Sequence, residues 1–543
     1  MKSLSKRHSR DRVLRGLKLE TLERREVFAV GGLDPTFGGG WGKAVTDFGG
    51  STDWSIDSAF QADGKIVVVG GTTAGGGNHN FALARYNSDG SLDASFGGFA
   101  GIGAGRVVTD FAAGMDQAQK VLIQPDGKIL VIGWTNPFGD ETGELPGYEN
   151  EPVQEHRWAV ARYNADGSLD STFGTLGKVV VHRPGEYDVV TVAGAFIVGD
   201  KLLLVSSAPE TSLISRLNLS DGSVDVAFGN SGHVLADTPI AIRAAALHGD
   251  GIVLAGNAKV GNSMAFSRIH MNGMVDSTFG VNGLAVIGPE FTSSQLYAVV
   301  VQADGSIVGA GEKSVVRVLA NGMADASFSV DGVARFEGEL YQFYDIALGP
   351  NGTIIAAGYV NSGLNFAVVR VGADGAPDQN FGVGGVVKID FGLFGFSADY
   401  GTSVLTYANG KILVTGIAGQ DFGLTRINGA AVLGNPGGPF RPGGLLGQIL
   451  NHPQSPGLLR LGGLTNLVER IDEAIARHRI GNTMPQNSSP SRPTAVPTSR
   501  TNSPSRSQRQ DLIDEFFAGL GAELRTRAGA MASPGQFPYQ VSL

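Results

Sequence analysis

One phrase returns along most of this chain, and it constrains the fold more than any other feature does. The pattern Leu-Asp-x-x-Phe-Gly stands at 33–38, 92–97 and 169–174, and altered copies follow at 224–229, 275–280, 324–329 and 377–382. Successive aspartates of these copies lie 49 to 77 residues apart. A period of this size is typical of repeat folds in which each unit is too small to bury its own hydrophobic face.

Two further phrases repeat with the same period. The phrases QADGKIVVVGG at 61–71 and FALARYNSDG at 81–90 each occur seven times in related form. Apolar runs flank Asp63-Gly64, a pair that favours a type I′ turn with positive φ at both positions, and this predicts a hairpin. The runs at 43–48 and 81–87 have the alternation of strands. Each unit is therefore predicted to form four antiparallel strands, with the hairpin strands in the middle.

Seven such units are predicted to close into a ring. A lone four-stranded sheet would expose both faces, whereas seven sheets stacked around an axis cover nearly all of them. The first copy of the motif, at 33–38, precedes the first sheet, and the last sheet stops at 429 without a copy. Residues 33–38 could thus fill the seam between the last and first sheets. We predict an all-β, monomeric protein in which 31–429 forms a seven-bladed β-propeller of four-stranded antiparallel blades.

The repeat phrases also carry a resemblance. GSLDASFGG at 90–98 and QADGKIVVVGG at 61–71 resemble the delta-60 repeat, a bacterial β-propeller repeat of unknown function, and all seven units take part. The resemblance implies a propeller. It transfers no reaction and no catalytic residues.

Residues 1–30 form a basic leader. The segment LETLERREVFA at 19–29 resembles LEPR-XLL, a short N-terminal motif of exported or surface proteins of certain bacteria, although 27–29 departs from its usual leucines and serine. The apolar run of a standard secretory signal is missing after the basic residues. The resemblance implies an extracellular or cell-surface location, and a basic tail without a role in export remains the alternative.

The repeats stop at 429, and the composition changes. A Gly/Pro linker and an amphipathic helix are predicted over 430–480, and a disordered tether rich in Ser, Pro and Arg over 481–510. A second short helix and a tail are predicted over 511–543. We expect these C-terminal helices to anchor or sort the protein.

Composition excludes several classes of function. The net charge of −9 leaves no broad basic face for nucleic acid. The chain has no cysteine, which excludes disulfides, thiolate nucleophiles and zinc–thiolate sites. No run of 18 apolar residues occurs, so no transmembrane segment is predicted. We expect neither a cofactor nor a metal, with calcium as an alternative in loops such as 87–93.

The repeated aspartates and arginines are predicted to be structural. An aspartate that follows a turn can accept backbone N–H groups two or three residues ahead, while the phenylalanine of its motif packs between sheets. An arginine among apolar neighbours needs a partner, so a ring of Arg–Asp pairs is predicted. An anion site formed by the seven arginines around the central channel is the alternative. The residues are Asp34, Asp93, Asp170, Asp225, Asp276, Asp325 and Asp378, with Arg85, Arg162, Arg216, Arg268, Arg317, Arg370 and Arg426.

Candidate binding residues lie where the units differ. The Asp-Gly turns and the motif connectors should share one side of the ring, and the variable loops the other. Those loops include an acidic insertion in unit two, expected between its third and fourth strands, and several aromatic residues that suit protein or carbohydrate contacts. The candidates are Trp134, Tyr148, Glu149, Glu151, Glu155, His156, Trp158, Tyr341, Tyr344 and Tyr400.

Two functions follow from this architecture. We favour a non-enzymatic, exported or cell-surface propeller that binds a protein or a glycan through the variable loops. The alternative is a hydrolase or lyase that acts on polysaccharide with acidic residues at the channel mouth. Paired carboxylates beside the axis would favour the enzyme. No catalytic residue is predicted.

Overall fold

The computed structural model describes residues 30–429 except 50–51, 75–78, 99–102, 112–113, 137–156, 182–190, 208–211, 289–294, 338, 340, 362–364 and 393–397. The chain divides into two units, 1–437 and 438–543, and every described residue belongs to the first. The leader predicted over 1–30, apart from Val30, and the segments predicted over 430–480, 481–510 and 511–543 lie outside the described residues. No helix within the described ranges has the length and apolar character needed to cross a membrane.

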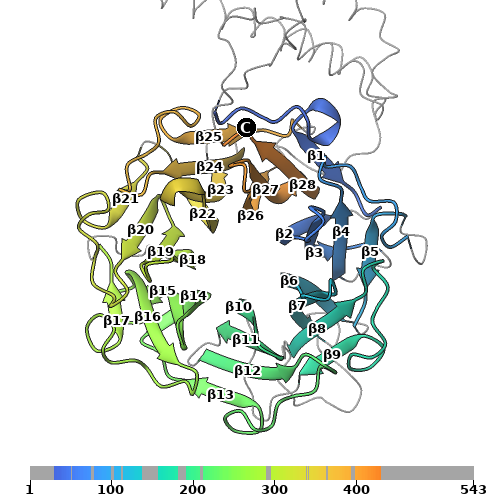
Figure 1. Ribbon diagram of the computed structural model, residues 1–543, viewed down its shortest axis with the longest axis horizontal. Helices are drawn as coiled ribbons and strands as arrows, with labels where there is room; N and C mark the ends of the chain where they lie inside the picture. Colours follow the sequence, from blue (N-terminus) through green and yellow to red (C-terminus); the bar gives the residue numbers. More distant parts are fainter. Residues whose placement is uncertain are drawn as a thin grey trace, which may run out of the picture. The chain divides into compact units, whose positions relative to one another are not determined.

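Seven four-stranded antiparallel sheets follow one another around an axis, which confirms the predicted seven-bladed propeller (Figure 1). The blades are β2 (Asp53–Phe60), β3 (Ile66–Thr72), β4 (Asn80–Tyr86) and β5 (Arg106–Thr109) in blade 1; β6 (Met115–Ile123), β7 (Ile129–Asn136), β8 (Arg157–Tyr163) and β9 (Lys178–Val181) in blade 2; β10 (Thr191–Val198), β11 (Lys201–Ser207), β12 (Ser212–Asn218) and β13 (His233–Ala236) in blade 3; β14 (Ile240–His248), β15 (Gly251–Ala258), β16 (Met264–His270) and β17 (Leu284–Val286) in blade 4; β18 (Leu296–Val301), β19 (Ile307–Gly311), β20 (Ser314–Val318) and β21 (Val333–Arg335) in blade 5; β22 (Tyr341–Leu348), β23 (Ile354–Val360), β24 (Asn365–Val371) and β25 (Val386–Ile389) in blade 6; and β26 (Asp399–Thr406), β27 (Ile412–Ala418), β28 (Asp421–Ile427) and β1 (Lys43–Thr46) in blade 7. Within the described residues, short 3₁₀ helices lie at Gly38–Gly40 and Pro350–Gly352.

The predicted grouping of strands into blades is shifted by one strand. Strand β1 is the outermost strand of blade 7, where Lys43 lies opposite Thr425 of β28, and not the first strand of blade 1. The Asp-Gly hairpin consequently joins the first, innermost strand to the second. The insertion of unit two at 137–156 connects the second and third strands of blade 2, β7 and β8, rather than the third and fourth.

The predicted seam between the ends of the ring is present. The amide of Gly31 donates to Asn428 O at 2.8 Å, and the amide of Asp34 donates to Arg426 O at 2.8 Å. Residues 30–46, which we call the latch, thus supply the connector and the fourth strand that blade 7 lacks. The ring is closed by its own N-terminal segment.

The Asp-Gly turn differs from the predicted type I′ turn. Gly64 has a φ of +82° and donates its amide to Gln61 O at 2.9 Å, whereas Asp63 is not among the residues with positive φ. Ala62 and Asp63 therefore form a type I turn, and Gly64 follows it in the left-handed conformation that completes a bulged hairpin.

Each inner strand contains one β-bulge at the same position, and this explains the glycine that ends the second phrase. In blade 2 the pairing shifts between Ala118 and Lys120, which leaves Gln119 without an opposite residue. A Cβ atom on Gly133, in the facing strand, would lie 1.9 Å from Gln117 O. No side chain fits at such a distance. The glycine recurs in six blades, and blade 3 has Ser206 at this position instead.

The hydrophobic core lies between the blades and not within them. Seven clusters of buried side chains are present, and each joins two consecutive blades. The cluster that joins blades 7 and 1 contains Phe37 of the latch together with Leu413 and Val68. Stacking thus buries both faces of every sheet, as the closure argument requires.

The predicted Arg–Asp pairs are present in all seven blades. The arginine belongs to the third strand of its blade, and its Nε donates to the aspartate of the connector, or in blade 7 to Asp34 of the latch, at 2.6–2.9 Å. Each guanidinium also lies over the phenylalanine of the same motif, with 4.3–5.2 Å between the guanidinium carbon and the ring centroid. The first and second strands separate these arginines from the centre of the ring. The alternative of an arginine-lined anion site is therefore wrong.

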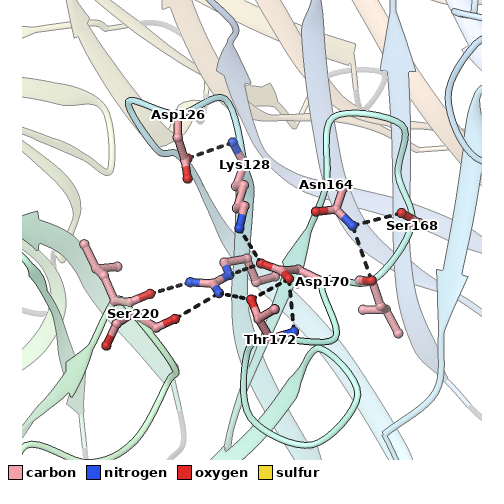
Figure 2. A network of polar contacts seen from close by, with 10 residues as sticks. Asp126, Lys128, Asn164, Ser168, Asp170, Thr172 and Ser220 are labelled. Atoms are coloured by element: carbon pink, nitrogen blue, oxygen red, sulfur yellow. Dashed lines mark hydrogen bonds and ion pairs between the residues drawn. The ribbon is translucent and has the colours of Figure 1, made fainter.

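The same arginines connect neighbouring blades. Figure 2 shows the network of blade 2, in which Asp170 accepts from Arg162 and Lys128, each at 2.7 Å, and from Thr172. Arg162 also donates to Ser220 O of blade 3 at 3.1 Å. Five other arginines make comparable contacts with a backbone carbonyl just after the third strand of the next blade. Burial would raise the pKa of Asp170, but the hydrogen bonds and the charge of Arg162 outweigh this effect and hold the pKa far below its usual range.

Candidate functional site

The two ends of the ring differ in the loops that they carry. The turns between first and second strands and the motif connectors lie at one end. The loops between second and third strands and those between consecutive blades lie at the other end, which we call the loop face. The bulge of each inner strand lies in the half nearer the loop face. The bulged residues are Ile56, Gln119, Ala193, Arg243, Tyr297, Tyr344 and Thr402.

Aromatic residues gather on one arc of this end. Tyr297 and Tyr344 meet edge to face with ring centroids 5.5 Å apart, and Tyr344 stacks on Tyr359 at 5.9 Å. Tyr359 in turn meets Tyr400 edge to face at 4.8 Å. We call these four residues the tyrosine array. All four side chains are half-buried, and they come from three consecutive blades, 5, 6 and 7.

Polar groups surround the array. The hydroxyl of Tyr359 donates to Gln342 Oε1 at 2.9 Å, and Nε of Arg243 donates to Gln295 Oε1 at 3.2 Å. A backbone bridge between Glu312 and Gln342 joins blades 5 and 6 beside the array. Burial, together with the negative charge of Glu312, raises the pKa of Tyr297, and burial raises that of Tyr344 as well. Tyr297 and Tyr344 therefore present neutral hydroxyl groups at physiological pH.

Three charged side chains follow the bulges of the inner strands, and we call them the axial charge cluster: Asp57, Lys120 and Asp345. Asp57 Oδ2 accepts the amide of Val121 at 2.9 Å, and Asp345 Oδ2 accepts the amide of Val404 at 2.7 Å. The carboxylate of Asp57 raises the pKa of Lys120 against the effect of burial. Burial raises the pKa of Asp345 to about 6, although the charge of Lys120 opposes this shift. The cluster balances two carboxylates against one ammonium group.

The candidate residues from the sequence have different surroundings. Tyr344 and Tyr400 belong to the tyrosine array, and Trp134 is half-buried on β7. The prediction that the loop aromatics are exposed is wrong for two residues. Trp158 is 1% accessible and lies in the core between blades 2 and 3. Tyr341 is 8% accessible and stacks on Phe343. The acidic insertion lies outside the described residues, and with it Tyr148, Glu149, Glu151, Glu155 and His156.

Sequence reasoning missed Tyr297, Tyr359 and the axial charge cluster. Tyr359 directly follows the glycine that faces the bulge, and Trp134 occupies the same position in blade 2. Aligning the seven copies of the second phrase at this glycine would have singled out both residues. Tyr297, Asp57, Lys120 and Asp345 lie at or just after bulges, which the repeat phrases do not reveal.

The oxygens considered for calcium have partners inside the connector. Asp89 Oδ1 accepts the amide and the hydroxyl of Ser91 at 3.0 and 2.6 Å, and the amide group of Asn87 donates to Ser91 Oγ at 3.0 Å. Asp93 divides its oxygens between Ser95 and Arg85. These contacts are those of an Asx-turn.

Another acidic group lies on the loop face at the seam. Asp47, Asp53 and Asp421 bring carboxylate oxygens within 4.8 Å of one another, the one such group of three in the described part of the chain with the geometry to hold a metal ion. Both oxygens of Asp53 already accept hydrogen bonds, from the amide of Phe48 at 2.7 Å and the hydroxyl of Thr72 at 2.5 Å. Burial and the charges of the other two carboxylates raise the pKa of Asp421 to about 6.

Asp116 occupies the position of Asp53 in blade 2. Its Oδ2 accepts the amide of Phe111 at 2.7 Å, and its Oδ1 is buried without a hydrogen bond among the residues that the structure describes. Burial, with the negative charge of Asp110 nearby, raises the pKa of Asp116 to about 7. This carboxyl group therefore gains a proton on folding between the pKa of the unfolded chain and about pH 7.

We expect the variant Asp116→Asn to become more stable relative to the parent as the pH rises. A carboxyl group with a raised pKa binds more protons in the folded state, so the stability of the parent falls from about pH 4 to pH 7. Asparagine keeps the acceptor for Phe111 and removes the ionisation. The difference in free energy of unfolding should approach about 4 kcal/mol above pH 7 and vanish near pH 4. Urea unfolding at pH 4, 5.5 and 8 measures it, and a difference that does not change with pH would contradict the raised pKa.

Comparisons with known proteins agree with the fold. A family model described as a domain of unknown function that forms a β-propeller matches residues 61–96, 124–143, 155–173, 302–328 and 349–381. No curated protein matches the chain.

Several solved structures are similar to this chain at low identity. A catalytically inactive virginiamycin B lyase from Staphylococcus aureus is 9% identical, with 70% of this chain and 98% of that chain covered and a TM-score of 0.41. A protein of unknown function from Dyadobacter fermentans is 9% identical over 71% and 97% of the two chains, with a TM-score of 0.39. A Trichoderma reesei carbohydrate-active enzyme of family AA12 is 12% identical over 75% and 98%, with a TM-score of 0.33. Nothing about a ligand or a reaction follows from these values.

Proposed function

We propose that this protein is a non-enzymatic β-propeller that binds a macromolecular ligand, a protein or a glycan, on its loop face. The tyrosine array carries the proposal. Its four half-buried rings come from three blades and contact one another in sequence. Tyrosine offers a large contact area at a low entropic cost and a hydroxyl group for orientation, which is why it is enriched at binding sites.

The location that we propose is extracellular or at the cell surface. The leader segment 19–29 supports export through its resemblance to LEPR-XLL, and the repeat phrases support membership of the bacterial delta-60 repeat proteins. The net charge of −9 disfavours nucleic acid as the ligand. We propose that the propeller acts as a monomer, because its ring is closed by its own latch.

Binding through the array can be tested with paired tyrosine variants. We expect Tyr344→Ala to weaken binding of a ligand found on a glycan and surface-protein panel by about tenfold or more, since the ring at the centre of a contact contributes most. Tyr407→Ala is the matched control, because Tyr407 lies after β26 at the opposite end of the ring, where its ring contacts that of Phe60 in a tilted arrangement with centroids 4.4 Å apart. Calorimetric titration measures affinity, and circular dichroism checks that both variants are folded. Equal losses in the two variants would contradict the proposal.

The second candidate is a hydrolase or lyase that acts on polysaccharide. One observation favours it: Asp57 and Asp345 both lie on inner strands, and the pKa of Asp345 is raised to about 6, as suits a general acid. Both carboxylates nevertheless accept backbone amides and share Lys120, as structural carboxylates do. Release of reducing ends or unsaturated sugars by the parent, and its loss in Asp345→Asn, would replace the binding proposal by this one.

A further inference from the structure

We propose that the ligand is a neutral polysaccharide chain that lies along the tyrosine array across blades 5, 6 and 7. This inference rests on the proposed function and selects one ligand class within it. The first argument is the length of the array. Tyr297 and Tyr400 stand at its two ends and are connected, among the described residues, through Tyr344 and Tyr359. A single sugar ring covers about one aromatic face, so a ligand that uses the whole array must be a chain.

The second argument is the kind of polar group beside the rings. Gln295 and Gln342 carry amide groups that both donate and accept; Gln295 accepts from Arg243, and Gln342 accepts from Tyr359 and is hydrogen-bonded to Tyr297. The tyrosine hydroxyls likewise donate and accept. Sugar hydroxyls have the same dual character. An aromatic surface edged by amides and hydroxyls therefore suits a polyhydroxylated chain.

The third argument is charge. Arg243 donates to the neutral amide of Gln295 and keeps its charge, whereas the charge of Lys120 is offset by Asp57 and Asp345. Glu312 adds a carboxylate whose charge acts on Tyr297 and Tyr359. These three carboxylates outnumber Arg243 and Lys120, so together the groups offer an acidic polysaccharide no net positive charge. The site is better matched to a neutral chain.

The fourth argument separates a glycan from a protein. Among the described residues, none of the exposed large aliphatic side chains belongs to β18, β22, β23 or β26, the strands that carry the array. The fully buried core of a protein interface is more apolar than its polar rim. Along their described residues, the strands of the array present tyrosine rings and polar groups instead.

The test uses the full chain and neutral oligosaccharides of increasing length. Affinity electrophoresis against β-1,4-glucan, β-1,3-glucan, xylan, mannan and α-glucan selects the polymer, with pectate and chitosan as the acidic and cationic comparisons. Calorimetry then measures the affinity for oligosaccharides of that polymer. We expect the affinity of the parent to rise with each added sugar until the array is spanned. Tyr297→Ala and Tyr400→Ala should each lose about tenfold with the longest oligosaccharides and less than about threefold with the shortest.

The outcomes separate the two proposals. Affinity that does not depend on length, end variants that affect long and short oligosaccharides equally, preference for pectate or chitosan, or no binding to any neutral polymer would each overturn the polysaccharide assignment. Binding of a protein ligand that Tyr344→Ala weakens and Tyr407→Ala does not would overturn it too, while the proposed binding function would stand. Binding that survives every variant of the array would overturn both.

Discussion

A variant that lacks residues 1–46 is expected to lose the cooperative unfolding of the ring. The latch supplies strand β1 of blade 7 and places Phe37 in the core between blades 7 and 1. It also supplies Asp34, which lies 2.6 Å from both Arg426 and Lys411. Loss of Asp34 would leave the buried Arg426 without a carboxylate, which alone costs about 3–5 kcal/mol. The exposed edge of β28 and the opened core add to this cost.

The matched control is a variant that lacks only residues 1–29. It retains every contact of the latch, so its melting temperature should equal that of the parent. Thermal unfolding followed by circular dichroism compares the two deletions, and a synthetic peptide of residues 30–46 should restore part of the lost stability to the longer deletion. A longer deletion that melts at the parental temperature would show that the ring does not depend on this closure.

The second large effect concerns a single arginine. Arg317→Met is expected to destabilise the propeller by about 3–5 kcal/mol, because Asp325 is buried and pairs with no second cation among the described residues. The added change Asp325→Asn should recover part of the loss, since it removes the uncompensated charge. Arg162→Met should destabilise the protein less than Arg317→Met does, because Lys128 remains 2.7 Å from Asp170 and still pairs with this carboxylate. Urea denaturation of the single and double variants measures these differences.

The cost of Arg317→Met should also depend on pH. Burial alone would raise the pKa of Asp325, but hydrogen bonds from Ser327 and the hydrogen bond and charge of Arg317 lower it. A lowered folded-state pKa contributes stability above the unfolded value of about 4, and this contribution is lost as the pH falls further. The parent and the variant should therefore approach one another below pH 4. If the difference in free energy of unfolding between the parent and Arg317→Met is the same at pH 3 and pH 7, the ion pair is not the source of that difference.

Periodicity predicts the ring, but it does not define where a blade begins. The order of phrases is the same whether the segment at 43–46 starts one sheet or ends another, since a closed repeat has no intrinsic first strand. The connector determines to which blade the next strand belongs. The amide of Asp93 donates to Arg85 O at 2.9 Å, and this hydrogen bond folds the chain back along the third strand. The next strand, β5, therefore pairs with β4 in the same blade. This hydrogen bond is not encoded in hydrophobic alternation.

The candidate site was predictable only in part for a related reason. The variable loops beside them indicate Tyr344 and Tyr400, but loop variation does not indicate how deeply a residue is buried. Trp158 lies directly opposite Trp134 on the neighbouring strand, and yet only Trp158 is fully buried. The bulge that sets the orientation of the inner strands becomes visible only when the glycine opposite it is recognised as a close backbone contact.

The seam has a mechanical consequence. Residues 31–34 run antiparallel to residues 426–428, and the two ends of the ring lie side by side, joined by the pairs Gly31–Asn428 and Asp34–Arg426. A load that pulls residues 30 and 429 apart therefore meets these bonds one after another, as in a zipper, rather than all at once in shear. Tension between the two flanking segments would thus open the propeller at blade 7 first, while the six remaining blades stay stacked.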